Sequence, residues 1–356
     1  MHNKRVFFVG GIVRDNILKI PTFGIDLLLI GNAIEFSKSL PPTIKIKSIH
    51  EDFCTVKLEY EGIEIDIASS RSEKYLYSGC LPVLDKVGVE LEEDVKRRDF
   101  TINSLYCELK FENNKINYNF IDLIDGLKDL QNKTLKVLHN KSYIDDPTRI
   151  IRGLNFKYRF GFDFSENDKI LISEYLNNIS YTNMSIDRNI KVIKKTLNSK
   201  NQSEIFKELT QKKYYKIINP EEIYFDYNLI SNIFNMFSLD MLTMSELYIK
   251  ILQNSKIETL NFEKLIQIYK TFSKFSLVDL SYYFYKTKDE NVLKYLKIKD
   301  ITLNITGSDL LNKGYKQGVL FGEILDKLLE EKLQNPNLFK NKKSELDWVL
   351  KSFPKN

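Results

Sequence analysis

The sequence predicts an α+β protein in which a strand-rich N-terminal part is followed by an all-helical remainder. Residues 1–130 contain short runs of β-branched and aromatic residues bounded by turn residues, which is typical of strands. From Thr134 onward the apolar residues recur at helical spacing. A chain of 356 residues is long enough for two or three domains with cores of their own. We expect four segments, at residues 1–130, 131–200, 201–300 and 301–356.

The N-terminal unit is predicted to run strand, glycine turn, helix, strand. Arg5–Val9 suits a buried strand, Gly10 and Gly11 follow at once, and Ile12–Leu18 spaces its apolar residues as a helix does. Ile25–Ile30 is predicted to be a second buried strand. Two glycines between a strand and a helix leave backbone N–H groups free and let a phosphate approach closely. An ordinary turn remains the alternative, because glycine is the default turn residue.

Two acids lie on strands that are otherwise apolar. Asp26 belongs to the second predicted strand, and Asp66 belongs to the strand predicted over Ile63–Ala68. A carboxylate there is costly to bury unless it is paired, and a metal ion is a natural partner. If these strands lie side by side, Asp26 and Asp66 can share one metal site. The alternatives are a cap or salt-bridge role for Asp26 and a solvent-facing position for Asp66.

A charged cluster follows near residue 100. Arg97 and Arg98 offer fixed forks of hydrogen-bond donors that suit phosphate. We expect Asp99 to be ionised and to hold an arginine in place, and Asn103 to reach a ribose hydroxyl or a backbone group. A helix N-terminus with a charged first turn would have a similar composition and stays the alternative.

A second charged group begins the helical part. Asp146, Arg149 and Arg152 are spaced by three along a helix that is predicted to begin at Pro147, so they lie near one face. A carboxylate only accepts hydrogen bonds and a guanidinium only donates them. Adenine and cytosine place an amino donor beside a ring-nitrogen acceptor, whereas uracil and guanine reverse that order. An Asp–Arg pair can therefore select A and C without a template, although a helix cap with a surface ion pair has the same spacing.

Together these patterns resemble, in order, the motifs of class II tRNA nucleotidyltransferases and bacterial poly(A) polymerases. Gly10–Asp15 (GGIVRD) matches the glycine motif of that family, and Arg71–Tyr75 matches R-x-E-x-Y. Arg97–Asn103 matches R-R-D-x-x-x-N, and Asp145–Arg152 matches the nucleotide-selecting motif. The resemblance is close for residues 5–164, and partial for 302–332. It departs at the family's D-x-D, where Gly24 stands in place of the first acid.

The resemblance implies a polymerase-β-like nucleotidyltransferase head with a mixed sheet, followed by a helical neck, body and tail. It implies attack of the 3′-hydroxyl of tRNA on the α-phosphate of CTP or ATP, with Mg²⁺ held by the catalytic acids Asp26 and Asp66. It also implies a set of nucleotide-binding residues, namely Gly10, Gly11, Arg14, Arg97, Arg98, Asp99, Asn103, Asp146, Arg149 and Arg152.

Three activities remain open at this point. The first is an enzyme that adds C, A or both to tRNA, and the second is an enzyme that resembles a poly(A) polymerase. The third is a catalytically impaired descendant that binds tRNA or nucleotide, because Gly24 removes one metal-binding acid and base selection does not require chemistry.

The composition adds few constraints. A net charge of +5 and a pI of about 8.7 allow an anionic partner without demanding one. The three cysteines show no metal-binding spacing, and no signal peptide or apolar run of membrane length is present. We therefore expect a cytoplasmic protein with no membrane partner. The basic stretches Arg188–Lys200 and Lys212–Lys216 would follow an RNA backbone, or would simply be solvated helix faces.

Overall fold

The computed structural model describes residues 4–22, 24–113, 115–179 and 185–354. The chain forms two compact units, Met1–Glu222 and Ile223–Asn356, and each is described by itself. The strand-rich part and the first helices after it thus belong to one unit. The boundaries that the sequence predicts at residues 130, 200 and 300 remain a prediction.

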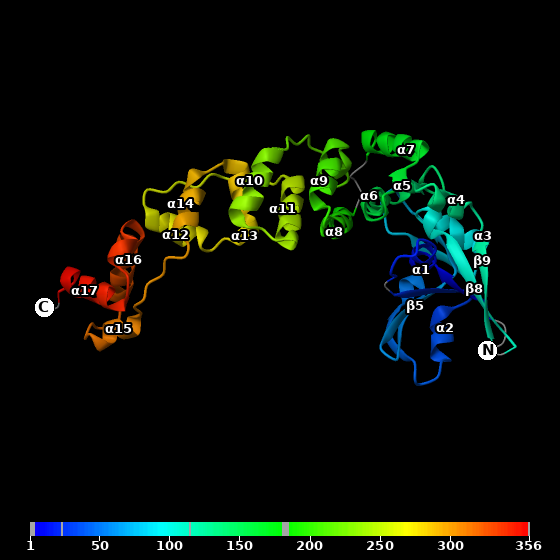
Figure 1. Cartoon of the computed structure of the whole chain (residues 1–356), viewed down its shortest axis with the longest axis horizontal. Helices are drawn as coiled ribbons and strands as arrows, with labels where there is room; N and C mark the ends of the chain where they lie inside the picture. The colour runs from blue at the N-terminus through cyan, green and yellow to red at the C-terminus, as the bar shows by residue number, and fades with distance from the viewer. Residues whose placement is uncertain (1–3, 23, 114, 180–184, 355–356) are drawn as a thin grey trace. The chain divides into compact units, whose positions relative to one another are not determined.

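A mixed seven-stranded sheet forms the head, in the order β3-β4-β5-β2-β1-β8-β9. The pairing of β2 with β5 is parallel and the other pairings in this sheet are antiparallel, as a mixed sheet requires. In Figure 1 these strands run from blue to cyan. Their bounds are β1 Val6–Val9, β2 Ile25–Leu29, β3 Lys45–His50, β4 Thr55–Tyr60, β5 Ile63–Ser69, β8 Leu105–Glu112 and β9 Lys115–Asp122. The predicted α+β class with a mixed sheet is confirmed.

Apolar side chains cover both faces of this sheet. One face packs Phe7, Leu28 and Tyr106 against Leu91 of the short helix α3, and the other packs strand residues against α2. Alternate residues of a strand point to opposite faces, so each strand contributes to both cores. The remaining elements of the head are β6 Arg71–Lys74, β7 Val83–Val87, α1 Gly11–Ile17, α2 Ala33–Lys38, α3 Leu91–Asp94, η1 Glu51–Phe53, η2 Val95–Arg97 and η3 Thr101–Asn103.

A 3₁₀ turn comes directly before strand β4. The 3₁₀ turn η1 occupies Glu51–Phe53, and Cys54 adopts a left-handed conformation with φ of 46°. This kink ends the turn and places Thr55 as the first strand residue. The chain reverses between β4 and β5 at Glu61 and Gly62, and both residues have positive φ.

Helices complete the first unit and pack closely against the head. Gly126, the first residue of α4, approaches the carbonyl of Thr101 so closely that an added Cβ would lie 2.3 Å from its oxygen. Asp122 accepts hydrogen bonds from the N–H groups that open this helix. The bounds are α4 Gly126–Gln131, β10 Thr134–Leu135, α5 Ser142–Asp145, α6 Thr148–Phe160, β11 Asp163–Phe164, α7 Glu166–Asn177, α8 Ile186–Leu197, α9 Gln202–Gln211 and η4 Tyr214–Ile217.

Helices joined by irregular segments make up the described residues of the second unit. Its C-terminal core contains the fully buried carboxylate of Glu345, which accepts from the backbone N–H groups of Asn304 and Ile305 and pairs with the ammonium of Lys332. The bounds are α10 Tyr227–Phe237, α11 Met241–Gln253, α12 Leu265–Phe272, α13 Leu277–Thr287, α14 Glu290–Ile298, α15 Gly307–Asn312, α16 Val319–Gln334, η5 Pro336–Leu338 and α17 Lys342–Ser352.

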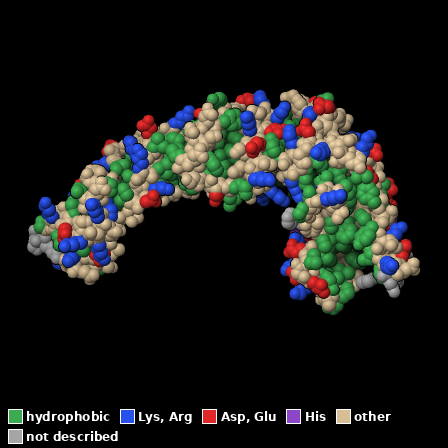
Figure 2. Space-filling model, viewed as in Figure 1, with side chains coloured by type: hydrophobic (Ala, Val, Ile, Leu, Met, Phe, Trp, Pro, Cys, Tyr) green, Lys and Arg blue, Asp and Glu red, His purple; other side chains and the backbone are tan. Residues whose placement is uncertain are grey.

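The surface of the head carries a broad area of hydrophobic side chains (Figure 2). On the β8–β9 hairpin, Phe111 is 70% exposed and Tyr118 is 66% exposed. Over the described ranges, no helix combines the length and the apolar character that crossing a membrane requires.

We expect Gly153→Ala to destabilise the first unit. An added Cβ would lie 2.3 Å from a ring carbon of Phe164, which packs against α6 at this point. Overpacking of this kind costs about 1–3 kcal/mol. This exceeds the gain of about 0.8–1.0 kcal/mol that alanine brings to a helix interior. Urea unfolding followed by circular dichroism measures the change.

The matched control is Gly322→Ala in α16, where an added Cβ meets no atom within 4 Å. This variant should gain stability from helix propensity alone. A Gly153→Ala protein as stable as the wild type would contradict the packing described here.

Candidate active site

The two predicted metal-binding acids are direct neighbours in the sheet. Asp26 on β2 is paired in register with Asp66 on β5, and these strands are parallel. Residues directly opposite each other on paired strands point to the same face. Both carboxylates are accessible to solvent and line a cavity of about 550 Å³. The expectation that these strands lie side by side is therefore met.

The two carboxylates repel each other. The pKa of Asp26 is raised above its ordinary value, first because the surrounding protein removes water from it and then because Asp66 adds a like charge. The ammonium of Lys57 lies 3.9 Å from Oδ2 of Asp66 and balances part of this charge. A pair of oxygen donors with uncompensated negative charge suits a hard divalent cation.

The position of the missing acid has an unusual backbone. Gly24 has φ of +90°, a conformation that L-residues rarely adopt, and an added Cβ would have open space around it. Among the described residues, no group of three or more His, Cys, Asp or Glu side chains forms a metal-binding cluster. The site thus offers two protein carboxylates, and any further ligands would come from substrate phosphate or water.

The glycine turn lies at the edge of the same cavity. Gly10 has φ of +70° between β1 and α1, and Gly11 begins α1. The N–H of Gly10 donates to the carbonyl of Leu105, 3.4 Å away. The expectation that both glycine N–H groups are free is therefore wrong for Gly10, because the sheet uses that donor.

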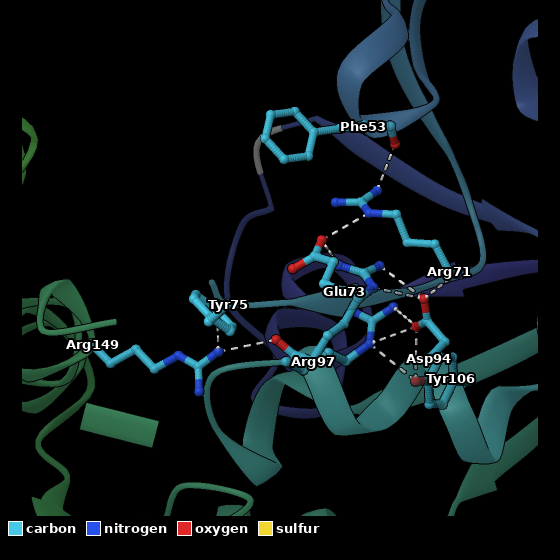
Figure 3. A network of polar contacts seen from close by, with 9 residues as sticks. Phe53, Arg71, Glu73, Tyr75, Asp94, Arg97, Tyr106 and Arg149 are labelled. Atoms are coloured by element: carbon cyan, nitrogen blue, oxygen red, sulfur yellow. Dashed lines mark hydrogen bonds and ion pairs between the residues drawn. The ribbon is translucent and has the colours of Figure 1, made fainter. Parts of the chain in front are cut away.

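One buried carboxylate organises the arginine cluster (Figure 3). Asp94 at the end of α3 is fully buried and accepts from Arg97, Arg98, the hydroxyl of Tyr106 and the backbone N–H of Arg71. Burial alone would raise the pKa of Asp94, yet the two guanidinium groups, Arg98 more than Arg97, hold it below its ordinary value. Asp94 therefore stays charged and fixes both predicted phosphate-binding arginines.

The matching R-x-E-x-Y residues join this cluster (Figure 3). Arg71 donates to Oε1 of Glu73 at 2.8 Å and to the carbonyl of Phe53 at 2.9 Å. Glu73 also lies 3.5 Å from a terminal nitrogen of Arg97. Tyr75 lines the cavity, and burial is the main cause that raises the pKa of its hydroxyl. The segment thus supports Arg97 from a second side.

Asp99 and Asn103 each contact an arginine. For Asp99 this agrees with the expectation that it holds an arginine in place. Oδ2 of Asp99 pairs with Arg152 of α6, and its Oδ1 accepts from the side-chain amide of Asn103. Burial would raise the pKa of Asp99, but Arg152 and these hydrogen bonds keep it below its ordinary value. The side-chain oxygen Oδ1 of Asn103 accepts a hydrogen bond from Nη1 of Arg14. Asn103 is therefore engaged between two charged side chains in this structure.

A second chain of charges joins α1 to α6. Arg14 donates twice to Oδ1 of Asp15, whose Oδ2 lies 3.2 Å from Arg159. The guanidinium of Arg14 also lies over the rings of Phe156 and Phe160, at 5.2 and 4.6 Å. Burial lowers the pKa of Arg14 from its ordinary value, although Asp15 opposes this effect. One face of α6 therefore fastens the helical neck to the head.

The side chains of Asp146 and Arg149, the two residues expected to select the base, have different partners in this structure, although the N–H of Arg149 donates to the carbonyl of Asp146 at 3.1 Å. Arg149 is 2% exposed, lines the cavity, and donates to Ser142, to the carbonyl of Arg97 and to the hydroxyl of Tyr75. Asp146 is 5% exposed and instead accepts from Thr148 and from Arg188 of α8.

The cavity brings together all the sequence-predicted site residues except Asp146. Those that line it are Gly10, Gly11, Arg14, Asp26, Asp66, Arg97, Arg98, Asp99, Asn103, Arg149 and Arg152.

Sequence reasoning missed two residues that support the site. Asp94 precedes Arg97 and Arg98 by three and four residues, and this helical spacing was a usable signal. Arg188 lies 42 residues from Asp146, so no local pattern announces their contact.

Comparisons with known proteins agree with this geometry. Residues 6–136 match the family described as the poly A polymerase head domain. An A-adding tRNA nucleotidyltransferase of Geobacter sulfurreducens is 37% identical over 170 residues, which is 47% of this chain and 19% of that protein. The corresponding protein of Aquifex aeolicus is 30% identical over 246 residues, which is 68% of this chain and 27% of that protein. The chain thus spans about a fifth to a quarter of the length of these two relatives.

Solved structures extend the likeness over the whole chain. An apo CCA-adding enzyme has a TM-score of 0.75 at 25% identity, and the match covers 99% of this chain and 92% of that one. A CCA-adding enzyme with CTP shares the fold at 23% identity and a TM-score of 0.73, with the same two coverages. Through the head domain at residues 6–136 and a fold shared with solved CCA-adding enzymes, the chain is similar to class II tRNA nucleotidyltransferases and poly(A) polymerases.

Proposed function

We propose that this protein adds C, A or both to the 3′ end of tRNA without a template, using CTP or ATP. The observation that carries the proposal is the in-register pair of Asp26 and Asp66 in a cavity lined by Gly11, Arg97 and Arg98. Nucleotidyl transfer needs little covalent chemistry from the protein, and depends on positioning and on neutralising charge. This cavity supplies acids for a cation and guanidinium groups for a triphosphate.

The relatives support this activity and its substrates. The two sequence relatives described above carry the name A-adding tRNA nucleotidyltransferase. Solved structures with the same fold include CCA-adding enzymes bound to CTP, to ATP and to tRNA. We extend these ligands to the present chain as a proposal, together with the expected cytoplasmic location.

The acids fit Mg²⁺ as the metal. This ion is commonly held by one or two carboxylates together with substrate phosphates, and it keeps several waters. Asp26 and Asp66 provide the two carboxylates, and the pKa of Asp26 is raised first by burial and then by the like charge of Asp66, which a bound cation would offset. When bound, the ion would neutralise charge on the phosphates and on the attacking hydroxyl.

Arg97 and Arg98 would bind the triphosphate with side chains that are already held in a fixed orientation. Asp94 takes the Nε and Nη2 donors of Arg98, which leaves its Nη1 donors for a phosphate. Arg97 is held between Asp94 and Glu73. Side chains that are already in place lose little freedom when the triphosphate binds, so the binding energy is kept for orientation. Arg149 then lies at the cavity wall for base selection.

A second candidate function is supported by Gly24. The family's first acid is missing, and the left-handed backbone at this position disfavours any L-residue. A protein that retains the arginines but has lost one metal ligand could bind nucleotide and tRNA without transferring anything. The two functions differ in whether labelled nucleotide becomes attached to RNA.

We expect the protein to incorporate labelled CTP or ATP into tRNA that lacks part of its 3′ end when Mg²⁺ is present. Denaturing gels of the RNA measure the incorporation, and omission of the metal provides the control. Tight tRNA binding without incorporation would instead support the second candidate function. Addition of long A tracts to unrelated RNA would support a poly(A) polymerase-like activity.

We expect Gly24→Asp to lower stability without metal and to raise the incorporation rate with Mg²⁺. The positive φ costs a non-glycine residue about 1–2 kcal/mol, and a third carboxylate adds repulsion. A further oxygen ligand favours metal binding, and one such group commonly changes a rate by orders of magnitude.

The matched control is Gly24→Asn, which has the same shape and the same backbone burden without the charge. Equal rates for the Asp and Asn variants at saturating Mg²⁺ would show that the missing acid does not limit this enzyme.

We expect Asp26→Asn to raise the melting temperature of the metal-free protein at neutral pH by about 1–2 °C, after allowance for solvent screening. The folded-state pKa of Asp26 is raised, so its ionised form costs stability above that pKa. The advantage of the variant should shrink as the pH falls through the raised folded-state pKa, and it should disappear below the unfolded-state pKa of about 3.9, where both states of the wild type are protonated.

Mg²⁺ should reverse the order of stability at neutral pH, because it stabilises only the protein that keeps both acids. Thermal melts with and without Mg²⁺ test both statements. A wild type that gains no stability from Mg²⁺ would contradict a metal site at Asp26.

A further inference from the structure

Arg188 holds the carboxylate that is expected to select the base. It lies in the first turn of α8, and its Nη2 donates to Oδ2 of Asp146 at 2.7 Å. The side chain of Asp146 is 7% exposed and that of Arg188 is 26% exposed, so the ion pair is largely shielded from water. Removing one partner of such a pair leaves a buried charge without compensation.

The other oxygen of Asp146 is also fixed. Oδ1 accepts from the N–H of Thr148 at 3.0 Å and from its hydroxyl at 2.6 Å. A carboxylate has about four acceptor positions. Thr148 and Arg188 take three of them, which leaves about one position on Oδ2 for the amino group of a base.

The pair lies next to the cavity. Tyr75 lines the cavity, and the charges of Arg149, Asp146 and Arg188 all act on its hydroxyl. Burial is the main cause that raises the pKa of Tyr75, while Arg149 and Arg188 oppose the rise and Asp146 adds to it. Arg149 also donates to this hydroxyl at 3.4 Å. The N–H of Arg149 donates to the carbonyl of Asp146 at 3.1 Å, so Asp146 lies directly beside a residue that lines the cavity.

We propose that Arg188 is a positioning residue for base selection, which orients Asp146 so that one free acceptor faces the amino group of cytosine or adenine. This inference rests on the proposed function. It also revises the expectation that Arg188 follows an RNA backbone, because its guanidinium already pairs with a buried carboxylate. Without Arg188, Asp146 keeps only its contacts to Thr148 and can turn, so acceptance of the wrong base becomes easier.

The test compares Arg188→Met with Arg188→Lys and with Lys191→Met, which changes an exposed lysine on the same helix. Single-nucleotide incorporation into tRNA lacking its 3′ residues gives kcat/KM for ATP, CTP, GTP and UTP. We expect Arg188→Met to lower the preference for ATP and CTP over GTP and UTP by about 10–100-fold, as displaced catalytic groups do. Arg188→Lys should restore part of the preference, and Lys191→Met should leave it unchanged.

A double-mutant cycle shows whether Arg188 acts through Asp146. In an Asp146→Asn background the further change Arg188→Met should have little effect on the preference. Loss of stability alone would reduce incorporation of all four nucleotides equally, and thermal melts of each variant record it. If Arg188→Met does not fold, the comparison of Arg188→Lys with wild type carries the same test, because the ammonium cannot reproduce the guanidinium geometry.

The outcomes separate this inference from the proposed function. An unchanged preference in Arg188→Met, or in Arg188→Lys if only that variant folds, overturns the role of Arg188 and leaves the activity standing. A wild type that adds no nucleotide is tested instead by thermal shift with each nucleotide. If the wild type then binds ATP and CTP in preference to GTP and UTP, and Arg188→Met abolishes this binding preference, the result supports the positioning role of Arg188 and contradicts catalysis. A wild type that treats all four nucleotides alike overturns both.

Discussion

The arrangement of the head depends on a single buried charge. The carboxylate of Asp94 lies in the interior, where an ionised group is stable only if donors surround it. Two arginines, a tyrosine hydroxyl and a backbone N–H supply those donors, and they come from β6, η2 and β8. Satisfying Asp94 therefore fixes how the small β6–β7 sheet, the arginine segment and the main sheet meet. The guanidinium groups of Arg97 and Arg98 reach the cavity in set positions as a by-product of this requirement.

The contacts between head and neck follow the same rule. Arg149, Arg152 and Arg159 lie on one face of α6, and each meets an acceptor of the head or its neighbourhood. Asp99 and Asp15 accept two of these arginines and are themselves tied to residues of the glycine motif and of the arginine segment. The motifs that are separate in the sequence are thus joined by ion pairs and hydrogen bonds, so displacement of one member would affect the others.

Much of this site was predictable from the sequence, for identifiable reasons. The sequence predicted that Asp26 and Asp66 share a site if their strands pair, whereas the register itself came from the structure. Motif order indicated the remaining cavity residues. The pairing of Asp146 with Arg188 was not predictable, because it joins two helices through a contact that no local spacing encodes. The backbone of Gly24 was also hidden, since a sequence shows that an acid is missing but not that the chain turns left-handed there. Residues 165–300 were predicted to be helical without bounds, although side-chain caps at Ser165, Asp226, Asp240, Ser276 and Asp289 begin several of these helices and were a usable signal.

The buried Glu345 in the second unit has a consequence for how this chain can change in length. Its carboxylate pairs with the ammonium of Lys332 and accepts hydrogen bonds from the backbone N–H groups of Asn304 and Ile305. These bonds join α17 to a segment about forty residues before it. Trimming α17 alone would strand an ammonium in an apolar interior. Deletion of the whole region from about residue 301 through α17 is therefore less disruptive than stepwise deletion that removes α17 first.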